Sequence, residues 1–435
     1  MTLNITFAQN LVASSTTGGT LTAAAQTIAG VKTCQDGLLI SNIMPSLTGS
    51  QNVTQWLKCL SQVQLKNANV GHAVAAYPAG TTVANYGYGG SVYSPQNNRI
   101  YFAPAYQGTS TTWHYVDCNS GVIVAYTAAA LAAVGAYGGG VYSPTQNRIY
   151  FIPQDFGTTS TWHYLDCGSN AVSTYTGMAT GTTGAYQGGV FSPTQNRIYM
   201  SPYNQSLASA TWHYIDCAAG TVGTYTGFNI GGGGACSGGV YSPTQNRIYF
   251  VPYFITTQST WWYVDCSTGS AVAYTHNAAV VSRCYYGGAY SPTQNRIYFA
   301  PSFQATASVW HYIDCSSGSV VAYTPGVTGV ASAYYGAVYH PALNRIYFVP
   351  SGQGTVSTWH YIDCNTGNVV AYTTTTLGSG VSPYNGGAYS PTQNRIYFSP
   401  YTQGPVNTWH YIGSSGDASG LCPYMFGSTI LSSTL

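Results

Sequence analysis

A segment of about 49 residues recurs seven times in this chain of 435 residues. The string Ser-Pro-Thr-Gln-Asn-Arg-Ile-Tyr returns with small variations, and a Trp-His-Tyr-Ile-Asp-Cys string follows each of its arginines about fourteen residues later. The arginines that mark the copies are Arg99, Arg148, Arg197, Arg247, Arg296, Arg345 and Arg395. Such a period restricts the chain to a repeat architecture, in which each copy is one supersecondary unit that packs against its neighbours.

Each copy contains four segments that are typical of short strands. In the second copy we predict strands a, b, c and d at residues 138–143, 148–153, 162–167 and 171–176. A Pro-Thr-Gln-Asn turn joins strands a and b, with asparagine at a position that requires a left-handed backbone. A period near 49 with four short strands is typical of a propeller blade, so seven copies predict an all-β, seven-bladed β-propeller over residues 71–413.

The ends of the array indicate how the ring closes. The seventh copy contains strands a, b and c, but its pattern stops after Ile412 and no strand d follows. Ahead of the first copy, Tyr77 precedes Ser94 by the same 17 residues that separate a strand-d tyrosine from the next strand-a serine elsewhere. We predict that residues 71–77, approximately, complete blade seven and remove its open edge. Residues 1–70 are expected to form a docking or assembly segment, and residues 414–435 a tail that packs near it.

The composition excludes several classes of protein. Only 5% of the residues are charged and glutamate is absent, whereas 14% are aromatic, including 41 tyrosines. Without clusters of lysine and arginine, binding to nucleic acid is not expected. Without an apolar stretch of about 18 residues, insertion into a membrane is not expected either. The first residues have neither the basic start nor the apolar core of a signal peptide, which predicts synthesis in the cytoplasm without a signal peptide.

Most of the charge in the repeats is one arginine and one aspartate per copy. The register of the b–c hairpin makes these two residues cross-strand neighbours, and we predict a partly buried pair with bidentate geometry available. Such a ring of acids could instead bind metal or act in acid–base catalysis, but a catalytic site occurs once, which favours the structural interpretation. Arg395 has no aspartate in its own copy, and Asp417 is its candidate partner. The predicted pairs are Arg99–Asp117, Arg148–Asp166, Arg197–Asp216, Arg247–Asp265, Arg296–Asp314 and Arg345–Asp363.

Histidine and cysteine also recur at fixed places. A histidine follows the tryptophan in six copies, and Trp262 replaces it in the other. Equivalent positions lie too far apart in a ring to share a metal ion, so we expect packed histidines with one hydrogen bond each. One cysteine, such as Cys118, ends strand c in six copies and is expected to be a small buried apolar residue. Whether Cys34, Cys59 and Cys422 form a disulfide is left open by the sequence.

The copies differ mainly in the loops of one face. The a–b and c–d turns are nearly constant and lie on one face of the disc, whereas the variable b–c and d–a loops lie on the other. These loops could merely fill the surface, but loops on a rigid scaffold often carry recognition. Tyrosine among small polar residues is typical of both protein and glycan contacts. The candidate binding residues are Tyr106, Gln107, Phe156, Tyr203, Asn204, Tyr253, Phe254, Arg283, Tyr285, Tyr384 and Tyr401.

The Ser-Pro-x-x-Asn-Arg-Ile-Tyr-Phe-x-Pro strand pair followed by Trp-His-Tyr-Ile-Asp resembles the seven-bladed β-propeller repeat families. It lacks the Gly-His and Trp-Asp pairs of WD40 repeats, and its glycines are placed differently from those of kelch repeats. The mixture of small polar residues and tyrosine with almost no charge is similar to virion structural proteins of phages and large DNA viruses. That resemblance implies a capsid, tail or other extracellular-assembly protein that contacts other subunits through residues 1–70 and 414–435 and displays the propeller to a host glycan or surface protein.

Two other functions remain open. A lectin-like propeller would bind glycans with tyrosine and tryptophan between its blades, and an enzyme would place its site on the variable-loop face. The sequence contains no Gly-x-Ser-x-Gly, phosphate loop or His-Glu-x-x-His motif. Acid–base pairs are scarce without glutamate. We therefore expect a non-enzymatic binding protein with no cofactor and no metal.

Overall fold

The computed structural model describes residues 72–131, 133–228, 230, 233–255, 259–374, 376–377 and 382–414. The predicted docking segment and all of the predicted tail except Ser414 lie outside these residues, as do Asp417 and the three cysteines whose pairing was left open. The expectations for those parts therefore stay predictions.

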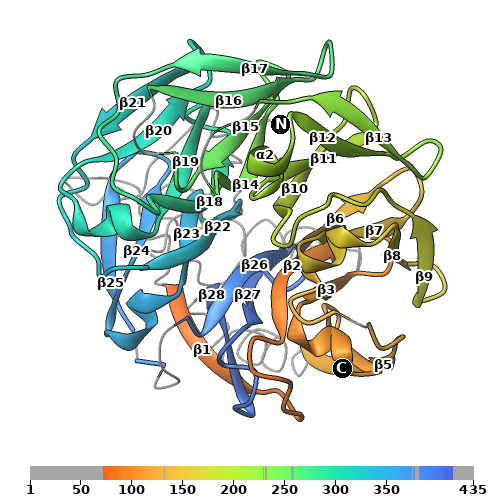
Figure 1. The fold of residues 1–435 in the computed structure, drawn as a ribbon. Coiled ribbons are helices and arrows are strands. Elements are labelled where there is room, and N and C mark those ends of the chain that lie inside the picture. The colour runs from red at the N-terminus through yellow and green to blue at the C-terminus, as the bar shows by residue number, and fades with distance from the viewer. Residues whose placement is uncertain are drawn as a thin grey trace, which may run out of the picture. The chain divides into compact units, whose positions relative to one another are not determined.

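Seven four-stranded antiparallel sheets form a ring, one sheet for each sequence repeat (Figure 1). This arrangement confirms the predicted all-β, seven-bladed propeller. Strand a of each blade lies nearest the centre of the ring: β2 (Tyr88–Ser94), β6 (Tyr137–Ser143), β10 (Tyr186–Ser192), β14 (Cys236–Ser242), β18 (Tyr285–Ser291), β22 (Tyr334–His340) and β26 (Tyr384–Ser390). Strand b follows it: β3 (Arg99–Pro104), β7 (Arg148–Pro153), β11 (Arg197–Pro202), β15 (Arg247–Pro252), β19 (Arg296–Pro301), β23 (Arg345–Pro350) and β27 (Arg395–Pro400).

The two outer strands complete each blade. Strand c is β4 (Thr112–Asp117), β8 (Thr161–Asp166), β12 (Thr211–Asp216), β16 (Thr260–Asp265), β20 (Trp310–Asp314), β24 (Thr358–Asp363) and β28 (Thr408–Ser414). Strand d is β5 (Val122–Thr127), β9 (Ala171–Thr176), β13 (Thr221–Thr226), β17 (Ser270–Thr275), β21 (Ser319–Tyr323), β25 (Val369–Thr373) and β1 (His72–Pro78). Within the described residues, helical segments are single turns in the b–c loops, none long enough to cross a membrane: η2 (Tyr106–Thr109), η3 (Asp155–Thr158), α2 (Gln205–Ala208), η4 (Phe303–Thr306) and η5 (Gly352–Thr355).

Blade seven is built from both ends of the ring. Its strand order is β1-β28-β27-β26, and β1 runs antiparallel to β28 with Tyr77 opposite Trp409. Figure 1 shows the orange β1 beside the blue β28, although these strands are more than 300 residues apart in the sequence. The predicted closure is confirmed, with a strand that begins at His72 and ends at Pro78.

Aromatic side chains form the core between neighbouring blades. The seven strand-c tryptophans are at most 1% exposed. The Trp113 ring packs edge-to-face on Phe151 of the next blade, with ring centres 5.7 Å apart, and Trp409 packs in the same way on Phe102, at 5.8 Å. Edge-to-face pairs of this kind contribute beyond the area that they bury. Each blade therefore depends on its neighbour for part of its core.

The a–b turns connect the blades on the constant face. The single hydroxyl hydrogen of Thr145 has two acceptors in the next blade, Oδ1 of Asn196 at 3.0 Å and the carbonyl oxygen of Cys217 at 3.2 Å. Thr392 makes the equivalent bond to Asn98 and so joins blade seven to blade one. Asn98 and Asn196 both have a φ of +51°, as predicted for the asparagine of this turn. The repeated turn sequence thus serves contacts between blades as well as the local turn.

A ring of glycines surrounds the central axis at the bulge of each strand a. A Cβ atom added to Gly90 would lie 3.4 Å from the Cα of Gly139, and one added to Gly386 would lie 3.5 Å from the Cα of Gly90. Six of the seven have a positive φ, which favours glycine. The seven are Gly90, Gly139, Gly188, Gly238, Gly287, Gly336 and Gly386.

Substitution of one glycine should test whether this central contact limits ring closure. Gly287→Ala adds strain at a φ of +73° and places a methyl group 3.1 Å from the Gly336 backbone. We expect it to lower the free energy of unfolding by roughly 2–4 kcal/mol. Gly326→Ala is the control, because its φ is +70° but no atom lies within 4 Å of the new methyl group. It should cost about 1 kcal/mol. Urea unfolding followed by circular dichroism measures both, and equal losses would contradict the expectation.

Candidate functional site

The repeated arginine lies opposite the repeated aspartate in six blades, but the predicted bidentate pair is replaced by a different contact. In the second blade the Nε atom of Arg148 is 3.9 Å from Oδ2 of Asp166, and both side chains are partly exposed. The same single 3.9 Å contact joins Arg197 to Asp216. The guanidinium instead lies over a strand-c tyrosine, with its central carbon 4.2 Å from the ring centre of Tyr164. This cation–π contact recurs in all seven blades at 4.2–4.6 Å.

The repeated aspartates hold the c–d turns. Oδ1 of Asp166 accepts hydrogen bonds from the backbone N–H groups of Ser169 and Gly168, both at 3.0 Å. The hydrogen bond from the Ser169 backbone is the main cause that lowers the pKa of this carboxyl group. Asp117 and Asp363 accept the equivalent backbone bond at 2.8 Å. These carboxylates have a structural task, and no group of three metal-binding side chains occurs in the described part of the chain.

Six histidines form buried pairs with the first tyrosine of strand a. Burial lowers the pKa of His114 to about 4, so its imidazole is neutral at pH 7, and Nδ1 shares a hydrogen bond of 2.8 Å with the Tyr88 hydroxyl group. In blade four, Cys236 and Trp262 replace both members of the pair together. The six pairs are Tyr88–His114, Tyr137–His163, Tyr186–His213, Tyr285–His311, Tyr334–His360 and Tyr384–His410.

Two predicted binding residues belong to these buried pairs. Tyr285 and Tyr384 are 0% exposed, which corrects their assignment to the binding surface. Sequence comparison placed them in the d–a loop, but each is the first residue of strand a and points into its blade. The prediction for cysteine is confirmed, since Cys118 and its equivalents are buried free thiols, and burial raises the pKa of Cys118 to about 11.

Three further candidates are also largely buried. Gln107 accepts a hydrogen bond from the Ala84 backbone and donates one to the Thr112 carbonyl oxygen, both at 2.8 Å, so it ties the d–a loop to strand c. Phe156 and Tyr253 are 7% and 6% exposed. Their burial argues for packing roles beneath the surface, which corrects the expectation of direct contact with a ligand.

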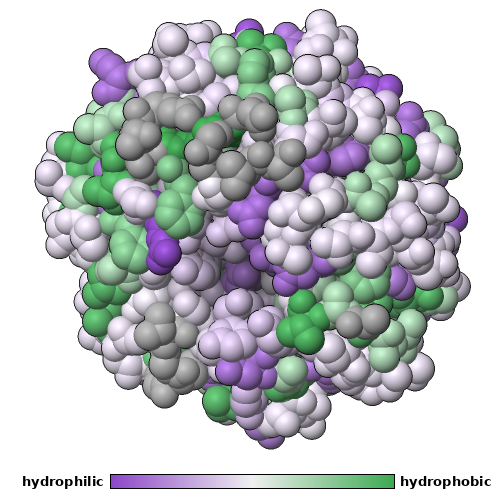
Figure 2. Space-filling view, viewed as in Figure 1, coloured by the Kyte–Doolittle hydropathy of each residue, from purple (hydrophilic) through white to green (hydrophobic). Residues whose placement is uncertain are grey.

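The other candidates lie on the variable face: Tyr106, Tyr203, Asn204, Phe254, Arg283 and Tyr401 are partly or fully exposed. Asn204 is partly engaged, because its Oδ1 accepts a hydrogen bond from the Gly234 backbone at 2.9 Å. Figure 2 shows this face of the ring, with a hollow at its centre lined by hydrophilic residues.

The second residue of strand a breaks the sevenfold regularity beside this hollow. It is glycine in blades one and two but a larger residue in the others, which makes the mouth of the hollow asymmetric. In chain order the residues are Gly89, Gly138, Gln187, Ser237, Tyr286, Tyr335 and Asn385. Tyr286 and Tyr335 were missed as candidates. An alignment of this single position across the seven copies would have revealed them.

Exposed and partly buried rings from several blades, together with the buried ring of Tyr253, form a cluster on this face, which we call the aromatic arc. It consists of Tyr86, Tyr106, Tyr203, Tyr253, Phe254, Tyr286, Tyr335 and Tyr401. Tyr286 and Tyr335 stack with ring centres 4.4 Å apart, and Tyr253 contacts Tyr286 edge-on at 5.8 Å. Tyr86 contacts Tyr401 at 4.9 Å. Burial, reinforced by neighbouring tyrosines, raises the pKa of Tyr401 to about 12, so this hydroxyl group stays uncharged at neutral pH.

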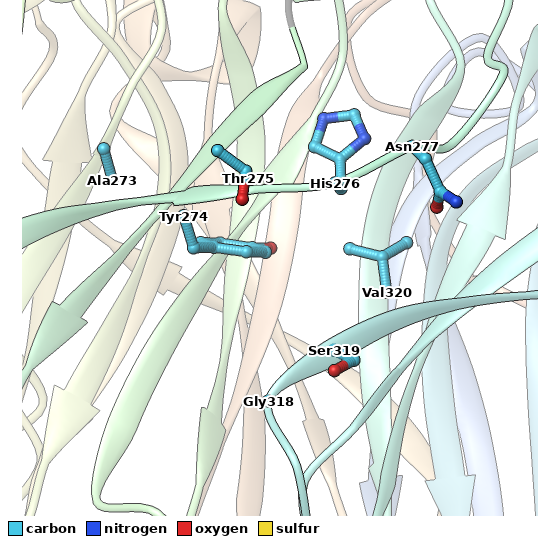
Figure 3. A pocket seen from close by; sticks show the side chains of 8 residues that line it. All are labelled: Ala273, Tyr274, Thr275, His276, Asn277, Gly318, Ser319 and Val320. Atoms are coloured by element: carbon cyan, nitrogen blue, oxygen red, sulfur yellow. The ribbon is translucent and has the colours of Figure 1, made fainter.

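A second concave region lies at the outer rim between blades four and five (Figure 3). It is an open groove of about 740 Å³ lined by hydroxyl, amide and apolar groups without a charged side chain. The ring of His276 contacts Trp261 in a tilted arrangement, with centres 3.9 Å apart, but Trp261 is 0% exposed. A lectin-like use of this tryptophan between blades is therefore not available. The lining residues are Ala273, Tyr274, Thr275, His276, Asn277, Gly318, Ser319 and Val320.

Comparison with known proteins identifies the architecture. No protein-family model and no curated protein matches the chain. The structure of U3-55K matches with a TM-score of 0.51 and 9% identity, covering 78% of this chain and 100% of that chain. The crystal structure of the RRP9 WD40 repeats matches with a TM-score of 0.52 and 10% identity, covering 78% and 99%. The shared feature is the seven-bladed propeller fold. At these identities the similarity concerns architecture alone.

Acid should destabilise the propeller through its buried histidines. Burial lowers the pKa of His114, His213, His311, His360 and His410 to about 4, from 6.5 in an exposed imidazole. A histidine whose pKa is lowered by folding does not oppose folding above the pKa that it has in the unfolded chain. Below that pKa the unfolded chain binds a proton that the folded chain does not, so the free energy of unfolding falls with the pH. We expect the free energy of unfolding, measured in urea by tryptophan fluorescence, to fall between pH 6.5 and pH 4.

The control for this prediction is His114→Gln, which removes one titrating group but keeps a side chain that can bond to Tyr88. The free energy of unfolding of this variant should change less steeply with pH than that of the wild type. The difference in slope should correspond to at most one bound proton. A stability that stays constant from about pH 7 to pH 5 would contradict the assigned role of the histidines.

Proposed function

We propose that this protein is a non-enzymatic propeller that binds another protein through its variable face. Nine large hydrophobic side chains are exposed among the described residues, and all but Val122 lie in the b–c and d–a loops of that face. Exposed apolar residues that gather on one face are typical of interaction surfaces. The eight are Tyr86, Tyr106, Val134, Met178, Phe228, Val281, Val309 and Val406.

The aromatic arc would anchor the partner at the centre of this face. Tyrosine and phenylalanine offer large contact areas at a low cost in side-chain entropy, and tyrosine also offers a hydroxyl group for hydrogen bonds. Rings near the centre of an interface, surrounded by smaller apolar contacts, are the usual arrangement of binding hot spots. The described part of this face carries one arginine and one aspartate outside the repeats, Arg283 and Asp155. Shape and aromatic contact would therefore contribute more than charge steering.

We further propose that the partner belongs to a virion or other extracellular assembly. The low charge and the surface of tyrosine and small hydroxyl residues support this role. The structures that share the fold support the architecture alone, since a propeller can carry many functions.

Paired valine substitutions test which face binds. The partner would be recovered with the full chain from its native source, purified, and titrated against variants by calorimetry. Val134→Ser combined with Val406→Ser should weaken binding about tenfold, because two exposed apolar contacts on the variable face are lost. Val122→Ser is the control, since Val122 is 56% exposed but lies after a c–d turn on the constant face. It should bind as the wild type does.

The reverse pattern, with weaker binding only in Val122→Ser, would contradict the proposal. Binding of glycans on an array, without any protein partner, would favour the lectin-like alternative instead.

A further inference from the structure

The residue two positions before strand a has a left-handed backbone in every blade. Its φ is between +53° and +74°. Glycine adopts this conformation without steric cost, and it occupies the position in three blades, as Gly135, Gly184 and Gly234. Tyr86 and Arg283 place large side chains there, at φ values of +61° and +58°. The turn therefore does not require these side chains, and holding them costs backbone strain.

The neighbouring b–c loop explains why glycine suits the other blades. A Cβ atom at Gly135 would lie 2.5 Å from Oδ2 of Asp155, and one at Gly234 would lie 2.5 Å from the ring of Phe254. Phe303 is the equivalent loop residue beside Arg283, and its backbone N–H donates to the Arg283 carbonyl oxygen at 3.1 Å. This bond fixes the turn, while the arginine side chain extends to the surface.

The guanidinium of Arg283 lies between two aromatic rings. Its central carbon is 5.2 Å from the ring centre of Phe254 and 5.7 Å from that of Phe303. Arg283 also adjoins the aromatic arc, because it opposes the rise in pKa that burial causes in Tyr203. The two rings restrict the side chain and leave the N–H groups at the rim for a ligand.

No ion pair to Arg283 is found within the described residues, and it is the only cation there outside the repeats. The repeated arginines, by contrast, each lie over a tyrosine, and six have an aspartate on the neighbouring strand. An exposed, unpaired guanidinium in a surface with almost no charge favours a planar anion, which it can bind through two parallel hydrogen bonds.

We infer that Arg283 binds a carboxylate of the protein partner, held between Phe254 and Phe303 at the edge of the aromatic arc. The carboxylate belongs to an aspartate or glutamate side chain or to a chain terminus. This inference rests on the proposed function, because the eight exposed apolar residues on the same face favour a protein over a glycan. It adds a chemical requirement that the partner must meet.

An array of random 12-residue peptides, each made with a free and an amidated C-terminus, provides the probe. The full chain should select peptides that contain Asp or Glu, or that require the free terminus, and the two arms separate these sources. Arg283→Gly should bind the selected peptides roughly 10- to 100-fold more weakly. Arg283→Lys keeps the positive charge but loses the planar set of hydrogen-bond donors. Its affinity should lie between those of the wild type and Arg283→Gly.

Thermal unfolding separates binding from a structural role. Because glycine occupies this turn in three other blades, Arg283→Gly should unfold at the same temperature as the wild type or higher. A lower unfolding temperature together with unchanged peptide binding would show that Arg283 is structural and would overturn the inference. So would a wild-type chain that binds no acidic peptide at about millimolar concentration.

Two outcomes distinguish this inference from the proposed function. Neutral peptides that lose affinity in the double valine variant but not in Arg283→Gly would overturn the carboxylate site and leave the protein-binding face intact. If the chain bound only carboxylated glycans, and Arg283→Gly weakened that binding, the protein partner would be ruled out for the proposed function and for this inference alike.

Discussion

The close approach of seven backbones around one axis is the constraint on which this structure depends. Each strand a bulges at a glycine that contacts the glycine of the next blade, and a side chain there would separate the blades. The outer parts of the ring follow from this spacing. Once the inner strands are in place, six of the seven strand-c tryptophans, Trp113 among them, can reach a phenylalanine of the next blade. The a–b turns can then bond to one another on the constant face.

This geometry explains why the repeats are so regular on one face and so variable on the other. In the a–b turn, the threonine, asparagine and arginine each contact a neighbouring blade or strand, so a change at one position would disturb two blades. In the b–c and d–a loops, buried residues such as Gln107 preserve the loop, while adjacent residues are free to change. Recognition is thus confined to positions that the ring does not need.

The period and the turn residues were sufficient to predict the blades, the closing strand and the left-handed asparagines, because these follow from local sequence and from counting. Side-chain partners were harder. The register correctly placed Arg148 opposite Asp166, but the guanidinium packs on Tyr164, since an aromatic face on the same strand covers it better than a partly exposed carboxylate. Tyr285 and Tyr384 were misjudged because periodicity does not reveal which residue at the end of a loop turns into the blade.

Departures from the repeat cluster in blades four and five. Cys236 and Trp262 replace a tyrosine–histidine pair there, His276 contacts Trp261, and Arg283 occupies a turn that suits glycine. The buried residues Cys236 and Trp262 replace both members of the pair together, so the blade stays packed. The exposed changes have no such compensation within the described fold. Since the other five blades maintain the ring, one segment can accept strain that a less redundant fold would not tolerate, and that segment adjoins the aromatic arc.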